Sequence, residues 1–229
     1  MIRDEPELAA RARRSGSIIS ELQALSSALR VAIARGEREP DSTKLARLEQ
    51  AARESAEAQL IAAAFAVVAG ARGAWGQPLL AARLLDELVH VPHVQETGLF
   101  LSHAPDLART AIACGRVEVA EWVLNTPEPE LPLHQHVLAS ARGAVAEARG
   151  DLPAAVDLYT EAARRWQAFG NVPERGHALL GQGRCLLALA RPGADGPLRE
   201  TRALFAGVGA RPFVAEADAL LRQALALTS

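Results

Sequence analysis

The chain has 229 residues, of which 49% are hydrophobic, 23% charged and 4% aromatic, and its formal net charge is −2. The apolar fraction is large enough to build a core, which excludes wholesale disorder, and the lack of a basic excess excludes a dedicated nucleic-acid binder. Abundant Ala and scarce aromatic residues favour helices over the strands of a sandwich or barrel.

The N-terminal part of the chain is predicted to form two helices. An apolar stripe with spacings of three and four lies on one face of the first helix. Its residues are Ile18, Leu22, Leu25, Leu29 and Ile33. The polar segment 36–41 ends this helix, and Asp41 or Ser42 is suited to cap the next one. We expect that second helix to run from Lys44 past Val68.

The stripe on the first helix has two interpretations. It packs on the rest of the chain, or it pairs with the same helix of a second copy to form a homodimer. Packing within the chain is favoured, because the heptad pattern lasts only about two turns beyond Ile18.

Several features concern the cellular setting. The longest apolar run, 60–71, covers about 12 residues, whereas a membrane span requires about 20. Residues 1–7 contain no apolar core of the signal-peptide kind. Cys114 and Cys185 are far apart in apolar helical sequence, which favours two reduced core thiols. We therefore expect no membrane partner and a cytoplasmic location.

From residue 73 onward a short motif recurs. Each copy reads Gly, polar, apolar or Pro, any, any, Ala, and then continues as an apolar-periodic helix. The copies begin at Gly76, Gly115 and Gly150 and reach Ala81, Ala120 and Ala155. A fourth, degenerate copy begins near Ala190. A period in the mid-thirties with two helices per unit is typical of a helical-hairpin solenoid.

The motif has a physical explanation. Gly after a helix adopts the left-handed backbone that ends it, and Ala five residues later lets the second helix cross closely over the first. The third unit extends the pattern to Gly143, Gly150, Ala155, Tyr159 and Ala162. Over residues 139–166 the sequence resembles tetratricopeptide (TPR) repeats, in which small residues face each other across two helices and an aromatic side chain fills the next gap. Ala139, Arg142 and Ala146 depart from that pattern, where the family usually has Trp, Leu and Tyr.

The resemblance implies an all-α, right-handed antiparallel helix-hairpin solenoid of about ten or eleven helices. Residues 1–72 would be an N-terminal helical hairpin region, residues 73–229 the repeats, and a helix over 213–227 the cap. The first helix of each unit would line a groove for a protein or peptide partner. In the best repeat that groove would include Val137, Ser140, Ala144 and Glu147.

A narrower resemblance covers residues 162–189, which include Trp166, Phe169 and the segment 170–175. They are similar to the C-terminal helical-repeat region of bacterial multidomain regulators. Those proteins join a class III adenylate/guanylate cyclase or a LuxR-type DNA-binding domain to an AAA/STAND-type ATPase. The resemblance implies a sensor or scaffold module of a signalling or transcription-regulating system.

Catalytic and metal-binding alternatives rest on few residues. Lys44 is the only lysine, and its neighbours do not form the Gly-x-x-x-x-Gly-Lys-Ser/Thr of a phosphate-binding loop. An alternative function is a small-molecule- or metal-binding enzyme that uses the His90, His93 and His103 region. Pro92 is expected to end the helix between the first two histidines. We therefore favour a chain that is not an enzyme and has no cofactor.

Overall fold

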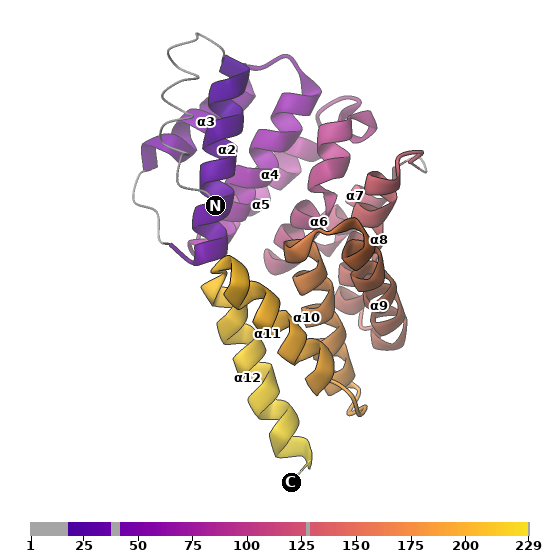
Figure 1. Cartoon of the computed structure of the whole chain (residues 1–229). Helices are drawn as coiled ribbons and strands as arrows, with labels where there is room; N and C mark the ends of the chain where they lie inside the picture. The colour runs from indigo at the N-terminus through magenta and orange to yellow at the C-terminus, as the bar shows by residue number, and fades with distance from the viewer. Residues whose placement is uncertain (1–17, 38–41, 127–128, 229) are drawn as a thin grey trace.

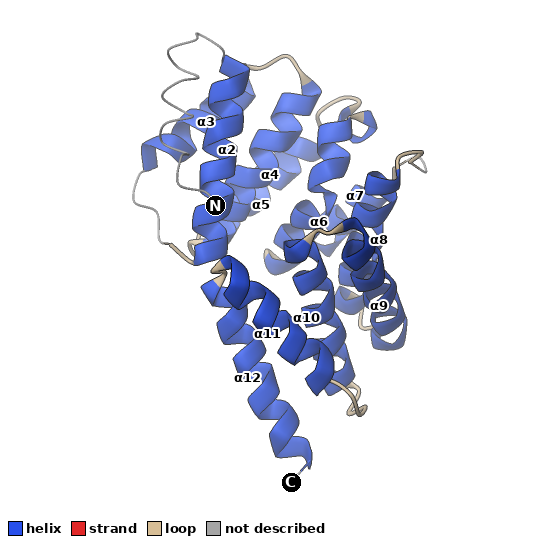
Figure 2. Ribbon diagram, in the orientation of Figure 1, coloured by secondary structure: helices blue, strands red, loops and turns tan. Residues whose placement is uncertain are grey.

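The computed structural model describes residues 18–37, 42–126 and 129–228, and every regular element within these ranges is helical (Figure 2). They comprise eleven α-helices and one short 3-10 helix, which confirms the predicted all-α class. In chain order they are α2 (Ile18–Arg35), α3 (Ser42–Glu54), α4 (Ala58–Ala74), α5 (Pro78–Val89), η1 (Val94–Glu96), α6 (Gly98–Ala113), α7 (Val117–Leu124), α8 (Pro132–Ala148), α9 (Leu152–Phe169), α10 (Val172–Ala188), α11 (Asp195–Val208) and α12 (Arg211–Thr228).

The helices pair into successive antiparallel hairpins, α4/α5, α6/α7, α8/α9 and α10/α11 (Figure 1). The first helix of each hairpin also packs on the first helix of the next, from α4 through α6 and α8 to α10. Helices α2 and α3 precede this row, and α12 follows α11 at its end. The predicted antiparallel helix-hairpin solenoid is therefore confirmed. No helix in the described ranges combines the length and the apolar character needed to cross a bilayer.

The apolar stripe of α2 packs within the chain. Leu22, Leu25 and Leu29 are all buried, and α2 contacts both α3 and α4. The side chain of Ile18, which begins the predicted stripe, lies outside the described residues.

The predicted long helix from Lys44 past Val68 is wrong, because the chain turns between α3 and α4. The Ser55 hydroxyl accepts a hydrogen bond from the backbone N–H of Glu57 (3.0 Å), and Glu57 is extended. Such a local bond offers the backbone a partner that competes with the helix. The turn lets the amphipathic α3 pack against the more apolar α4. Of the two candidate caps, Asp41 lies outside the described residues.

The recurring glycines lie at the turns within the hairpins. Gly76, Gly115 and Gly150 have φ angles of 79°, 73° and 81°, a left-handed conformation that Gly adopts at little cost. In the degenerate fourth turn Ala190 takes that conformation (φ 51°), and Gly193 follows at φ 91°. The hairpin turns are therefore geometrically alike although the fourth has lost its first glycine.

The ring of Tyr159 on α9 lies between a glycine of α8 and a glycine of α10. A Cβ atom on Gly143 would stand 2.8 Å from the ring, and one on Gly181 would overlap its far edge. Only 5% of Tyr159 is exposed, and its hydroxyl donates to Glu147 (2.7 Å). The two glycines therefore allow three helices to pack closely around one aromatic ring.

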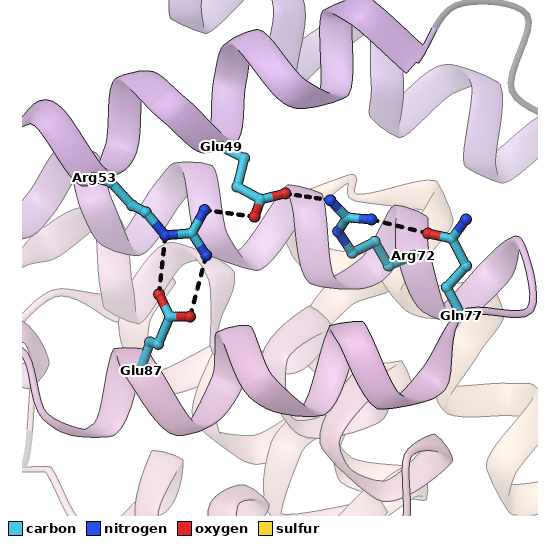
Figure 3. A network of polar contacts seen from close by, with 5 residues as sticks. All are labelled: Glu49, Arg53, Arg72, Gln77 and Glu87. Atoms are coloured by element: carbon cyan, nitrogen blue, oxygen red, sulfur yellow. Dashed lines mark hydrogen bonds and ion pairs between the residues drawn. The ribbon is translucent and has the colours of Figure 1, made fainter.

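A polar network joins α3, α4 and α5 (Figure 3). Arg53 donates two hydrogen bonds to Glu87 (3.1 and 3.2 Å) and one to Glu49. Arg72 donates to Glu49 and to Gln77. These contacts join α3 to α4 and, through Arg53 and Glu87, to α5 of the following hairpin.

We predict that Gly181→Ala lowers the free energy of unfolding by about 1–3 kcal/mol, because the added Cβ overlaps the Tyr159 ring. The matched control is Gly207→Ala on α11, where a Cβ meets nothing within 4 Å. There the helix propensity of Ala should raise stability by up to about 1 kcal/mol. Urea denaturation of both variants tests the prediction. A Gly181→Ala protein as stable as the parent would contradict it.

Candidate functional site

Two ion pairs join first helices that are not neighbours in the row. Arg30 on α2 lies 3.4 Å from Asp106 on α6, and Arg109 on α6 pairs with Glu174 on α10. Packed helices lie about 8–10 Å apart, so alternate helices of a flat row are about twice as far apart. Side chains bridge that gap where the row bends toward them. The ion pairs therefore mark the concave side of the solenoid.

Arg109 is the central residue of this concave side. Its Nη1 and Nη2 donate to the two carboxylate oxygens of Glu174 (3.0 and 2.7 Å), and Nη2 also donates to Asp106 (2.7 Å). Asn171 caps α10 by accepting from the backbone N–H of Glu174 (3.1 Å). The carboxylate of Glu174 thus sits at a helix N-terminus, where negative charge is stabilised. Both ends of the bidentate pair are held in place by their own helices.

The surroundings of these charges keep them ionised. Burial within the concave side raises the pKa of Asp106, but Arg109 and Arg30 more than offset that effect and hold the pKa well below its ordinary value. Burial lowers the pKa of Arg109, but Glu174 and Asp106 raise it further, and the guanidinium stays charged. Water still reaches this region, since 37% of the Asp106 side chain is accessible.

Two neutral histidines flank the ionic centre. Burial and the nearby charge of Arg109 hold the pKa of His177 well below its usual value. Its ring packs edge-on against Phe205 and Phe213, with centroids 5.1 and 4.5 Å away. Burial also lowers the pKa of His103, whose Nδ1 has no hydrogen-bond partner.

A second ionic group connects α8, α10 and α12. Glu147 accepts hydrogen bonds from Tyr159 and from Arg184, and Arg184 also donates to Glu216 (2.7 Å). Burial and the Glu147 carboxylate raise the pKa of Cys185 to about 12, which keeps this thiol protonated and unreactive. Ionic contacts therefore connect α2, α6, α8, α10 and α12.

The residues expected to line a groove have different positions in the structure. Val137, Ser140 and Ala144 are 4%, 5% and 8% exposed, and the Ser140 hydroxyl accepts from the indole N–H of Trp166 (2.6 Å). Glu147 remains partly exposed, with its carboxylate bound as described above. The four residues thus supply one carboxylate to the concave side and three buried contacts.

The sequence pattern did not indicate the central ionic residues. Arg109 and Glu174 are 65 residues apart and belong to different hairpins. Neither belongs to a recurring motif, and only the curvature of the row brings them together. The signal that existed was local: Asn171 followed three residues later by Glu174 is a typical helix start.

The four alanines of the repeat pattern occupy close crossings between helices. Ala81, Ala120, Ala155 and Ala162 are all 0% exposed. They space the helices of their hairpins and contribute no group to the concave surface.

The histidines of the enzyme alternative lie in separate environments. His90 Nδ1 is 2.8 Å from the carbonyl oxygen of Asp86, and the exposed His93 pairs with Glu96 (3.1 Å). His103 is buried on α6. In the part of the chain that the structure describes, no group of three or more His, Cys, Asp or Glu side chains is arranged to hold a metal ion.

Comparison with known proteins yields two structural neighbours. No family model matches the sequence, and no curated protein matches it significantly. The neighbours are crystal structures of a Podosopora anserina kinesin light chain protein with nearly identical TPR-like repeats, one of a variant and one of the unaltered form. Both are 22% identical to this chain and cover 90% of it and 95% of their own length, with TM-scores of 0.43 and 0.41. The helix-hairpin fold of this chain is defined by the contacts between its own helices.

We predict that Asp106→Asn destabilises the protein at neutral pH by about 1 kcal/mol, allowing for solvent screening. Because the folded-state pKa of Asp106 is lowered, its contribution is complete above the unfolded pKa of about 3.9 and is lost as the pH falls through the folded value. Urea denaturation of both proteins between pH 7 and pH 2 should therefore show the difference in unfolding free energy narrowing below about pH 4. A difference that stays constant over this range would refute the prediction.

Proposed function

We propose that the chain is a non-catalytic interaction module that binds a protein or peptide segment along the concave side of its solenoid. The observation that supports this most strongly is the series of charged side chains contributed by α2, α6, α8, α10 and α12. A solenoid presents such a curved surface across several units at once. A partner that lies along it can contact many helices without a deep pocket.

The exposed cations suggest how a partner would be held. The side chains of Arg30 and Arg184 are 53% and 40% exposed, although each already contacts a carboxylate. A guanidinium has five N–H donors, so each can donate to a carboxylate of the partner while keeping its internal contacts. Such contacts favour specificity and fast association over raw affinity.

The enzyme alternative has less support from the site. His90 and His93 are engaged with Asp86 and Glu96, and His103 lies in a separate, buried environment. The charged groups of the concave side are engaged with one another across several helices. That arrangement suits the recognition of an extended partner.

The narrower sequence resemblance suggests a setting. We propose that the module acts in the bacterial cytoplasm as the sensor or scaffold part of a signalling or transcription-regulating ATPase or cyclase system. The support is the similarity over residues 162–189, which form the end of α9 and all of α10. A two-hybrid assay between this chain and the ATPases and cyclases of its source cell tests the setting, and no interaction with any of them would count against it.

Selection of binding peptides from a random display library tests the interaction itself. We predict that Arg30→Ala and Arg184→Ala each lower the affinity for the selected peptides at least fivefold, because each removes a cation from the concave side. Arg199→Ala is the control, since its side chain is 69% exposed on α11 and pairs only along its own helix. Fluorescence anisotropy measures the affinities. The proposal fails if no peptide is enriched, or if all three variants bind like the parent.

A further inference from the structure

The apolar packing of this solenoid joins neighbours. The buried residues form three clusters, which follow the chain from α2–α8 through α8–α10 to α10–α12. In such an array each unit contacts the next, and small rotations between units add up along the row. The separation of the first and last helices is therefore sensitive to any contact that bypasses the neighbours.

Three contacts bypass them. The first two are the ion pairs Arg30–Asp106 and Arg109–Glu174, each of which passes over the hairpin that lies between its two helices. The third joins the ends of the row: Pro212 at the start of α12 lies against Gly36, just after α2, so closely that a Cβ on Gly36 would stand 2.7 Å from the proline ring. Figure 1 shows the start of α12 beside the end of α2.

The energetics of the two ion pairs differ from those of the apolar clusters. The desolvation of paired charges offsets much of their mutual attraction, so a partly exposed ion pair contributes little net stability. Salt weakens it further, because mobile ions screen the charges over about 3 Å at 1 M ionic strength. The hairpins therefore stay intact under conditions in which the two ion pairs separate.

We propose that these three contacts form a strap that holds the solenoid closed, and that its release opens the concave side while every hairpin stays folded. Arg109 is the main element of the strap, because it binds Glu174 in a bidentate manner and fixes Asp106, the partner of Arg30. Closure brings α12 onto α2. Opening separates the two helices, because no apolar cluster includes both.

Distance measurement by double electron–electron resonance tests the strap in the full chain. Nitroxide labels are placed at Ser27→Cys on α2 and Gln223→Cys on α12, both exposed positions. Cys114→Ala removes the partly exposed native thiol, and Cys185 is fully buried. The strap predicts one narrow distance distribution at low salt. In Arg109→Ala and in Glu174→Gln the mean distance should lengthen by about 5 Å or more and the distribution should broaden.

Two comparisons make the test specific. Arg53→Ala removes another bidentate Arg–Glu pair, the one in Figure 3 that joins α3 to α5 without passing over an intervening hairpin, and should leave the distance unchanged. Raising NaCl to 1 M should lengthen the distance in the parent but not further in Arg109→Ala. Circular dichroism monitors folding, and if Arg109→Ala does not fold, the isosteric Glu174→Gln decides the outcome. Distributions of Glu174→Gln and the parent that superimpose, or an equal shift in Arg53→Ala, would overturn the proposal.

Discussion

The close approach of α8, α9 and α10 around the ring of Tyr159 is the constraint on which the concave side depends. Gly143 and Gly181 supply the space, and any side chain at either position would push a helix away. The same approach brings the Tyr159 hydroxyl to Glu147, and Glu147 within reach of Arg184. A packing feature thus positions a charged group at the surface. Without it the ionic contacts between α8, α10 and α12 would lose their geometry.

Two kinds of interaction stabilise this solenoid. Apolar contacts and small residues fix each hairpin against the next, as the fully buried Ala155 and Ala162 illustrate. The ion pairs Arg30–Asp106 and Arg109–Glu174 act between first helices that are two places apart. The first kind is strong, local and insensitive to salt, whereas the second is weak, long-range and sensitive to it. A scaffold built in this way can keep its units intact while its curvature responds to charge.

The sequence predicted the features that local physics determines. A glycine in a left-handed turn and an alanine five residues later recur at regular intervals in the sequence. The hairpin solenoid could be predicted from that recurrence. The break between α3 and α4 was missed, because Ser55 and Glu57 interrupt a helical pattern by a single side-chain hydrogen bond. The pairing of Arg109 with Glu174 could not be predicted, since curvature is the sum of small rotations that no single motif encodes.

The bridge between α6 and α10 is tested most directly by the coupling energy between Arg109 and Glu174. A double-mutant cycle measures it, with Arg109→Ala, Glu174→Ala and the double variant compared by urea denaturation. If the two side chains bridge α6 and α10 in solution, their coupling energy should be about 1–2 kcal/mol, as expected for a bidentate, partly buried pair. Effects that add to within about 0.5 kcal/mol would show that the two side chains do not interact, and would contradict the account.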